Sequence, residues 1–381
     1  MTVHKETQPA SERETAAVEH LYFHIPFCPK ICPYCCFYVE EGGQNKNQAF
    51  LDALLLEVTR AMEKNRIRPK TIYFGGGTPT ALRFEQLEYL LCGLKSLLDM
   101  SALEEWTMEA NPATVREDKA ALLKQIGVTR ISLGVQSWSD RCLKILGRTH
   151  SAEQAAATYK ILRAQDFPSL NIDLMFSIPG QSLPEWESDL DTTIKLNPNH
   201  ISAYCLTYEE DTDFFKKLTG GEFLQNEEHD AALFESTMDR LSCGGYAQYE
   251  ISNHARSGAI SRHNMAYWEG RDFLGFGPSA FSTVGEKRTQ NVCDTAAYSL
   301  RLQAGISPIH SQEELSADTR LRERIAFGLR MAAGLEADLL TPWADETAHL
   351  MEIGLLEATD RRFRLTRRGK MLADLVASSF V

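Results

Sequence analysis

From about residue 20 to residue 207, short apolar runs alternate with longer amphipathic segments, and this alternation limits the fold more than any other feature of the sequence. Such alternation is typical of βαβ units, which build a parallel sheet. Six runs predict either a doubly wound sheet or part of a (β/α) barrel, and in both architectures chemistry gathers at the carboxyl ends of the strands. The predicted strands are Leu21–Phe27, Thr71–Phe74, Trp106–Glu109, Arg130–Val135, Asn171–Phe176 and His200–Leu206.

The pattern changes after about residue 208. Residues 211–246 have a helical pattern, and residues 247–300 have a loop- and strand-like one. The last 70 or so residues read as a small helical domain containing a short hairpin and then a helix, which gives it a winged-helix-like α+β character. The expected parts are a polar tail at 1–17, a core domain at 18–210, an extension at 211–310 and a C-terminal domain at 311–381.

Four of the nine cysteines crowd into one loop, HIPFCPKICPYCCF at 24–37, directly after the first predicted strand. This crowding indicates a metal or cluster site in a reducing compartment, because a disulfide scaffold would spread its cysteines. Cys28, Cys32 and Cys35 have the spacing C-x3-C-x2-C, so they can bind three irons of a [4Fe–4S] cluster and leave the fourth open. S-adenosylmethionine (SAM) can chelate that iron through its amino and carboxylate groups, and an electron from the cluster then cleaves the sulfonium to a deoxyadenosyl radical.

Two alternatives for this loop stay open. Cys36 is a candidate fourth ligand, although neighbouring side chains of an extended loop point to opposite sides. The other alternative is a structural zinc site with a distant fourth ligand. The proline and aromatic residues of the loop suit an apolar shield around a cluster better than a zinc knuckle.

A glycine-rich turn and a carboxylate follow the second and third strands. Gly76 and Gly77, with Thr78, lie in the turn FGGGTP, where glycine lets the backbone approach a ligand closely. A flexible turn is the alternative, and no Lys-Ser/Thr follows as a P-loop requires. Glu109 ends the third strand, where a carboxylate can accept hydrogen bonds from ribose hydroxyls.

Further polar candidates follow the next strands. Gln136 ends the fourth strand, Arg148 lies beyond the following helix, and Asp173 lies in the fifth strand. A charged residue within an apolar strand needs a partner, so a buried Asp173–Arg148 ion pair is a structural alternative to ligand binding. A polar residue at the end of strand after strand is what a binding site at the mouth of a barrel requires.

The composition excludes several other classes of protein. The formal net charge of -12 argues against a nucleic-acid partner, which usually requires clustered lysine and arginine. No apolar run reaches the roughly 18 residues of a membrane span, and the N-terminal segment lacks the apolar core of a signal peptide. We therefore expect a cytoplasmic protein with no membrane span.

Five motifs together point to a known family. LYFHIPFCPKICPYC, YFGGGTPT, GVQS, NIDLMFSIPG and HNMAYW resemble the radical SAM family of oxygen-independent coproporphyrinogen oxidases, and in particular its shorter branch, the HemW-type heme chaperones. The resemblance runs from about Tyr22 to the C-terminus. It implies an open, partial (β/α)6 TIM barrel, the radical SAM core, whose mouth is closed by the smaller C-terminal domain.

The resemblance also implies roles for individual residues. The residues that would contact the cluster-bound SAM are Tyr22, Gly76, Glu109 and Phe281. A further group matches positions that hold a second SAM in the decarboxylases, and in this chain its members either contact the single SAM or no longer bind one. This group comprises Gly77, Thr78, Gln136, Arg148 and Asp173.

The block HNMAYW at 263–268 matches a motif, HNxxYW, that is associated with heme binding in HemW-like proteins. A neutral imidazole such as that of His263 is a good axial ligand for heme iron, and Tyr267 and Trp268 could stack along a porphyrin. The alternative is that the block merely anchors the C-terminal segment to the barrel. His254 is a weaker candidate.

Three functions compete. The resemblance implies first a protein that binds the cluster, SAM and heme and transfers heme to an acceptor protein, with flavodoxin or ferredoxin as the electron donor. The second is coproporphyrinogen decarboxylation, or a related radical methyltransferase or heme-degrading reaction. The decarboxylases carry a fourth cysteine where this chain has Phe37, and they have a longer segment before the loop than the 27 residues that precede Cys28. The third is a structural zinc protein.

Overall fold

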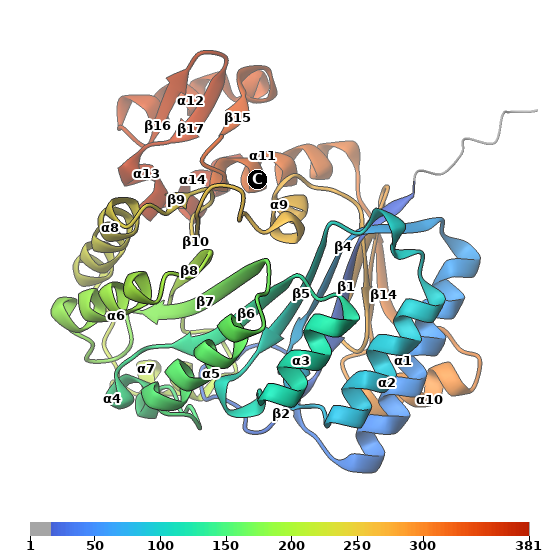
Figure 1. Ribbon diagram of the computed structural model, residues 1–381. Coiled ribbons are helices and arrows are strands. Elements are labelled where there is room, and N and C mark those ends of the chain that lie inside the picture. Colours follow the sequence, from blue (N-terminus) through green and yellow to red (C-terminus); the bar gives the residue numbers. More distant parts are fainter. Residues whose placement is uncertain (1–16, 381) are drawn as a thin grey trace, which may run out of the picture.

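The computed structural model describes residues 17–380, so the expected polar tail at 1–17 lies outside the described residues except for its last residue. Within residues 17–380, no helix combines the length and the apolar character that crossing a membrane requires. Figure 1 shows the chain as a layer of strands covered by helices, with the C-terminal segments above it.

Six parallel strands form the centre of the molecule, in the spatial order β1-β4-β5-β6-β7-β8. The described strands β1 and β8 do not pair with each other, because each is flanked by a different later strand, and the barrel is therefore open. This confirms the expected partial (β/α)6 barrel and excludes the doubly wound alternative. The strands are β1 (Val18–Ile25), β4 (Ile67–Gly76), β5 (Glu105–Ala110), β6 (Arg130–Gln136), β7 (Ser169–Phe176) and β8 (His200–Cys205).

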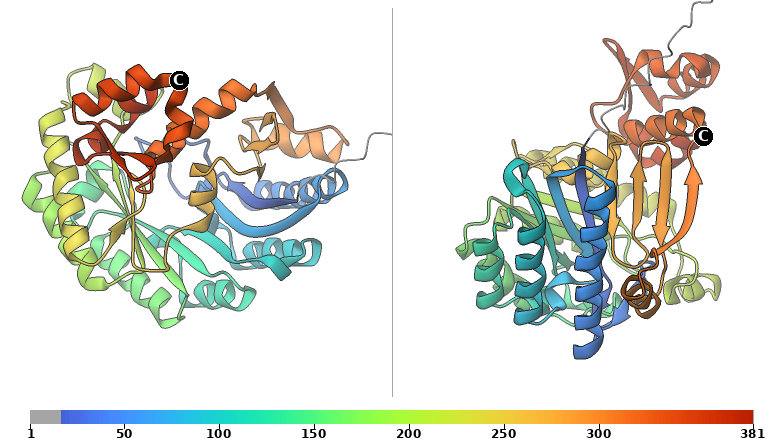
Figure 2. Two further views of the ribbon diagram at one scale, coloured as in Figure 1. Left: turned by 90° about the horizontal axis from the view of Figure 1, so that it is seen from above. Right: turned by 90° about the vertical axis from the view of Figure 1, so that its right-hand side faces the viewer.

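Helices cover the outer face of this arc, as the left view of Figure 2 shows. Each buries its apolar stripe against the strands; in α2, for example, Leu87, Leu90, Leu91 and Leu94 are fully buried at helical spacing. The longer helices of the core are α1 (Gln44–Lys64), α2 (Phe84–Leu97), α3 (Glu117–Ile126), α5 (Ala152–Ala164), α6 (Leu183–Leu196) and α8 (Glu227–Cys243). The short ones are η1 (Pro79–Ala81), η2 (Met100–Ala102), η3 (Pro112–Thr114), α4 (Asp140–Ile145) and α7 (Asp213–Thr219).

Later segments extend both edges of the sheet to twelve strands. At one edge β11 pairs in parallel with β1 and continues into an antiparallel meander; at the other, β10 and β9 pair beyond β8. These strands are β9 (Ala247–Gln248), β10 (Asn253–Ala255), β11 (Phe273–Phe276), β12 (Phe281–Val284), β13 (Lys287–Asn291) and β14 (Ile309–Glu314). A separate pair joins β2 (Phe27–Cys28) to β3 (Glu40–Glu41).

Two helices lie in the stretch expected to be loop- and strand-like. HNMAYW forms α9 (Arg262–Trp268), which is capped by the Ser261 hydroxyl, and α10 (Thr295–Gln303) is capped by Asp294. Seven or nine residues are too few for a clear amphipathic period, so the caps are the stronger signal for these helices. The expected boundary at 310/311 falls inside β14.

The C-terminal unit (residues 317–380) has an apolar core of its own, built around residues such as Ile325, Leu329 and Phe380. The expected wing is present: β16 and β17 form a hairpin that is followed by a helix. The elements are α11 (Ala317–Arg330), β15 (Leu335–Glu336), η4 (Ala337–Trp343), α12 (Ala344–Glu352), β16 (Leu356–Thr359), β17 (Arg362–Leu365), α13 (Arg367–Met371) and α14 (Ala373–Ser378).

This unit lies at the amino ends of the barrel strands, whereas the family resemblance led us to expect it over the mouth. Figure 1 shows it at the top, with β2 of the cysteine loop at the bottom. The cause is the meander: Glu314 at the end of β14 pairs with Lys287 at the start of β13, and Lys287 pairs with Val284 at the end of β12. Because β12 runs against β11, its end lies at the amino side of the barrel, and α11 begins there.

Candidate functional site

A cavity of about 440 Å³ lies at the carboxyl ends of the parallel strands, and we call it the cysteine cavity. Its wall comes from the loop after β1 and from the ends of β4 to β8, where a barrel of this kind is expected to carry its site. Most of the residues singled out in the sequence line it. They are Cys28, Cys32, Cys35, Gly76, Gly77, Thr78, Glu109, Gln136, Arg148 and Asp173.

The cysteine loop turns back on itself, with the Cys35 N–H donating to the Cys32 carbonyl at 3.1 Å. The Cys28 sulfur lies 3.5 Å from the Thr78 hydroxyl, and the Cys32 sulfur accepts from the Arg148 guanidinium at 3.6 Å. Burial raises the pKa of the Cys28 thiol and raises that of Cys35 to about 11. The protein alone therefore disfavours these thiolates, and a bound cation would stabilise them.

The three thiols form a donor set that fits a cubane. Within residues 17–380, no three Cys, His, Asp or Glu side chains lie close enough together to hold one metal ion. A [4Fe–4S] cluster attaches each thiolate to a different iron, so its ligands must share a cavity and need not converge on a point. The three thiols share this cavity, and each of Cys28 and Cys35 feels the charge of Cys32. Cys36 and Phe37 lie at the exposed rim of the same cavity.

The glycine turn joins the end of β4 to the cysteine loop. The Gly77 N–H donates to the Ile25 carbonyl at 2.9 Å, and the Thr78 N–H donates to the Phe27 carbonyl at 2.8 Å. Gly76 has φ +97, and a Cβ there would collide with the His24 ring. Close packing, which holds the cysteine loop against β4, thus explains the glycines first. The N–H groups of Gly77 and Thr78 are already used in these contacts.

Glu109 lies at the floor of the cavity, where β5 ends. Its carboxylate accepts a hydrogen bond of 2.7 Å from the Tyr73 hydroxyl and another from the Gly76 N–H. Burial raises its pKa to about 7, and the nearby Asp173 adds to the effect. Tyr22, which does not line the cavity, stacks on Tyr73 at 6.2 Å between ring centroids and supports it from behind.

Asp173 and Arg148 do not form the ion pair that was the structural alternative. Asp173 accepts from the Ser132 hydroxyl at 2.9 Å and from the Asn171 amide at 2.6 Å. The Arg148 guanidinium donates to the Gly134 carbonyl at 2.8 Å and to the Cys32 sulfur. Burial raises the pKa of Asp173, and its hydrogen-bond donors oppose that rise. Both side chains therefore keep polar atoms that face the cavity.

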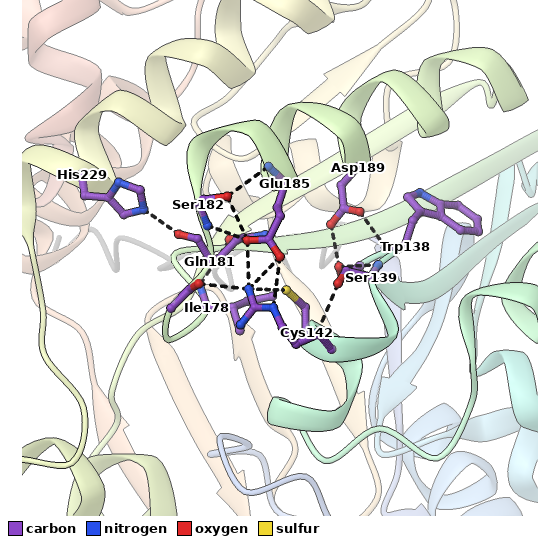
Figure 3. Close-up of polar contacts among 12 residues, drawn as sticks. Trp138, Ser139, Cys142, Ile178, Gln181, Ser182, Glu185, Asp189 and His229 are labelled. Carbon is purple, nitrogen blue, oxygen red and sulfur yellow. Dashed lines mark hydrogen bonds and ion pairs between the residues drawn. The ribbon is translucent and has the colours of Figure 1, made fainter.

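Gln136 has φ +72, unusual for a residue other than glycine, and the β6–β7 register shifts beside it. A buried carboxylate behind the cavity fixes this turn: Asp189 of α6 accepts from the Ser137 hydroxyl at 2.6 Å and from the Trp138 N–H at 2.9 Å. Figure 3 shows the contact between Asp189 and Trp138, and beside it the capping box in which Glu185 and Ser182 begin α6.

Sequence reasoning missed several residues of the wall. Tyr73 holds the Glu109 carboxylate, and Met175 and Tyr204 supply apolar surface. Tyr73 had a usable signal, since it stands directly before the glycine turn on the strand face that alternates inward. Tyr204 had one as well, since it lies near the end of its strand on the same face as the polar residues His200 and Ser202.

His263 lies inside the barrel, near its amino end. Its Nδ1 is 2.7 Å from the Thr71 hydroxyl, and its ring stacks on Tyr73 with centroids 5.1 Å apart. Burial lowers its pKa to about 3, and its Nε2 is buried without a hydrogen-bond partner. The backbone N–H groups of Arg262 and His263 donate to the Glu105 carboxylate at 2.9 and 3.0 Å, which anchors α9 to β5.

Tyr267 and Trp268 line a second cavity of about 1120 Å³, which we call the α9 cavity; His263 is not part of its wall. Phe281, which the family resemblance assigns to SAM, lines this α9 cavity and not the cysteine cavity. The reason is its position on β12, which lies beyond β11 in the antiparallel meander.

Comparison with known proteins supports the resemblance to the radical SAM family that the sequence motifs indicate. The sequence profile of the Radical SAM superfamily matches residues 22–193, and that of the HemN C-terminal domain matches residues 315–372. The chain is 34% identical to the heme chaperone HemW of Bacillus subtilis (strain 168), over 94% of this chain and 98% of that protein. It is 33% identical to the heme chaperone HemW of Mycobacterium tuberculosis (strain ATCC 25618 / H37Rv), over 95% and 94%.

A solved structure shares the fold. Coproporphyrinogen III oxidase (HemN) from Escherichia coli superposes with a TM-score of 0.83 at 24% identity, over 96% of this chain and 90% of that one. The radical SAM profile implies a [4Fe–4S] cluster and SAM as cofactors. On the strength of full-length relatives above 30% identity, the chain belongs to the radical SAM superfamily and, within it, to the family of proteins named heme chaperone HemW.

Proposed function

We propose that this protein is a heme chaperone that binds a [4Fe–4S] cluster, SAM and heme and transfers the heme to an acceptor protein. The observation that carries the proposal is the cysteine cavity, in which three thiols and the polar ends of successive strands face one space. The family supports the heme part, since the full-length relatives carry that function in their names.

Within this proposal, Cys28, Cys32 and Cys35 would hold the cluster, and the strand ends that line the same cavity would hold SAM. When bound and reduced, the cluster supplies the electron that cleaves the SAM sulfonium. Glu109 accepts hydrogen bonds from the ribose hydroxyls, and Tyr73 fixes its orientation. Arg148 lies against the Cys32 sulfur and therefore also lowers the negative charge of the loaded loop.

The partners follow from the same chemistry. A cluster that receives single electrons needs a small donor such as flavodoxin or ferredoxin, and heme transfer needs an acceptor protein. Free thiols throughout residues 17–380 suit a reducing compartment, so we propose the cytoplasm.

Anaerobic reconstitution with iron and sulfide tests the first half of the proposal. The expected result is a [4Fe–4S] EPR signal that changes when SAM is added, and that is lost in a Cys28→Ser, Cys32→Ser, Cys35→Ser triple variant. Cys36→Ser serves as the matched control and should keep the signal. Bound zinc without an iron signal would support the structural zinc alternative instead.

Heme titration tests the second half. Stepwise addition of hemin to the reconstituted protein should produce a saturable Soret band at one heme per chain. The absence of saturation would refute the chaperone function while leaving the cluster assignment intact.

A second candidate, coproporphyrinogen decarboxylation, draws support from one observation. The residues that match the second SAM position of the decarboxylases line the cysteine cavity together. Against it, Phe37 stands where those enzymes carry a cysteine, and its side chain is 65% exposed. Incubation of the reduced protein with SAM and coproporphyrinogen III decides the matter, and formation of protoporphyrinogen would replace our proposal.

A further inference from the structure

Buried polar side chains lie inside the barrel between β6, β7 and β8, where branched apolar residues are the usual filling. Ser132, Asn171 and His200 are cross-strand neighbours in one layer. Asp173 and Ser202 are neighbours in the next layer, which is nearer to the cysteine cavity. Figure 1 shows the three strands side by side, and alternate residues of each strand face the same side. Burying polar groups costs free energy unless they are hydrogen-bonded, and these groups are all joined in one network.

Asn171 is the centre of this network. Its amide nitrogen donates to the Asp173 carboxylate and to the Ser132 hydroxyl, each at 2.6 Å, and to the Ser202 hydroxyl at 3.0 Å. Because each serine oxygen accepts a hydrogen from this amide, its own hydrogen is left for Asp173. The Ser132 hydroxyl donates to that carboxylate at 2.9 Å, and the Ser202 hydroxyl contacts it as a further donor. The orientation of the Asn171 amide therefore decides whether Asp173 is surrounded by hydrogen-bond donors.

His200 fixes that orientation. Its Nδ1 lies 2.7 Å from the Asn171 amide oxygen, which has no hydrogen to give, so Nδ1 carries the proton and donates. The other ring nitrogen, Nε2, is then the acceptor, and the Tyr249 hydroxyl donates to it at 2.8 Å. The Tyr249 oxygen in turn accepts from the Ser261 N–H, so its own hydrogen is committed to His200. Every hydrogen of this chain therefore points from Tyr249 toward Asp173.

The chain requires a neutral His200, and the surroundings keep it neutral. The ring is fully buried, and burial lowers its pKa well below the usual range, with the positive charge of Arg130 adding to the effect. The same Arg130 charge opposes the rise that burial causes in the pKa of Asp173. The side chains of His200, Asn171 and Tyr249 do not line the cysteine cavity, so they act on it only through the carboxylate that does.

We propose that His200 is a positioning residue for SAM binding: through Asn171 it surrounds the Asp173 carboxylate with donors, so that a fixed negative charge lines the cavity that receives this cation. SAM carries a sulfonium and an ammonium group against one carboxylate, so its net charge is positive. S-adenosylhomocysteine has the same skeleton without the sulfonium charge. The inference rests on the proposed binding of SAM in the cysteine cavity, and it adds residues that lie behind the wall of that cavity.

Equilibrium binding of SAM and of S-adenosylhomocysteine to the cluster-loaded full chain tests this role. His200→Leu should weaken SAM binding by about tenfold and S-adenosylhomocysteine binding by less than about threefold, because only SAM carries the sulfonium charge. His200→Gln keeps one donor and one acceptor and should recover part of the SAM affinity. Tyr246→Phe is the matched control, since the buried Tyr246 hydroxyl donates to the Pro198 carbonyl at 2.9 Å and takes no part in the chain; it should bind SAM like the wild type.

A double-variant cycle separates positioning from general damage to the fold. Asp173→Asn should itself weaken SAM binding by about tenfold, and adding His200→Leu to it should cause less than about a further twofold loss, because the group through which His200 acts is already gone. Additive losses, or equal losses for SAM and S-adenosylhomocysteine, would show that His200 supports the site by packing alone. Wild-type SAM affinity in Asp173→Asn would overturn the proposal as well, since no charge would then need positioning.

The direction of the chain is tested without SAM. In the cluster-loaded wild type labelled with nitrogen-15 histidine, the ring-nitrogen chemical shifts should report a proton on Nδ1 of His200, whose signals are identified by their loss in His200→Gln. A proton on Nε2 would overturn the proposal, even where His200→Leu fails to fold. A wild type that binds no SAM would refute the proposed function, whereas a wild type that binds SAM as tightly as His200→Leu does would refute only the positioning role.

Discussion

Glu109 combines burial with a position at the floor of the cysteine cavity, and its pKa of about 7 follows mainly from burial. A carboxylate that accepts hydrogen bonds from ribose hydroxyls must be ionised, so ligand binding and deprotonation are linked. The protonated fraction of the free protein is small well above pH 7 and dominates well below it.

SAM affinity should therefore rise with pH through this range. Between pH 6 and pH 8 we expect an increase of about tenfold in the affinity of the cluster-loaded protein, because SAM binds only the fraction that is ionised. Equilibrium binding of SAM under anaerobic conditions measures it. Glu109→Gln should bind SAM more weakly at pH 8 and lose the pH dependence, while Tyr73→Phe should keep the dependence; a flat profile in the wild type would contradict the role.

Among the elements, α9 depends on a residue far away in the sequence. The Glu105 carboxylate accepts the N–H groups of Arg262 and His263 at the start of this helix, while the neighbouring Glu104 forms an exposed ion pair with Arg262. The two adjacent glutamates thus contact the same helix in opposite environments, one buried and one in solvent.

This contrast gives a matched pair of variants. Glu105→Gln should lower the free energy of unfolding by about 1–3 kcal/mol, because one of the two carboxylate oxygens is replaced by a donor facing buried N–H groups. Glu104→Gln should lower it by less than about 1 kcal/mol. Urea unfolding followed by tryptophan fluorescence compares the two variants. Equal losses in the free energy of unfolding would show that the buried Glu105 carboxylate stabilises the fold no more than the exposed Glu104 carboxylate does.

Asp189 on α6 is a second residue that joins two elements, because its carboxylate holds the turn after β6. Burial raises its pKa from 3.8 to about 6, so the folded state holds a proton that the unfolded state releases. This group therefore destabilises the fold increasingly as pH rises from about 4 to about 6, and fully above that range.

Asp189→Asn removes the titration and keeps an acceptor for the Ser137 hydroxyl. We expect the stability of the variant relative to the wild type to increase by about 2–3 kcal/mol between pH 4 and pH 7. Urea unfolding of both proteins across this pH series gives the difference, and a constant difference would refute the assigned pKa.

At the scale of the whole molecule, the two cavities lie at opposite ends of one barrel. The cysteine cavity lies at the carboxyl ends of the strands, and the α9 cavity lies beside the amino ends with the C-terminal unit. One connection between the two ends runs along β4, since Tyr73 contacts both Glu109 and His263.

Binding of the cluster at one end of the barrel should therefore have little effect on binding of heme at the other end. The triple variant Cys28→Ser, Cys32→Ser, Cys35→Ser, which lacks the cluster ligands, should bind hemin within about twofold of the reconstituted wild type, since binding at one site shifts the other only through a differential interaction. Soret titrations of both proteins measure this. A loss of tenfold or more would place heme at the cluster end and contradict the separation.

The sequence by itself determined the parallel barrel and most of the cysteine cavity. Apolar period and strand length are local signals, and the carboxyl ends of parallel strands meet at one edge, so Cys28, Glu109 and Asp173 could be grouped without coordinates. Only the tertiary structure decided that Phe281, Tyr267 and Trp268 share a different cavity and that the C-terminal unit lies at the amino ends. Those facts depend on the direction in which the β11–β14 meander returns the chain. No local pattern of residues fixes that direction, because it is set by strand pairing between segments far apart in the sequence.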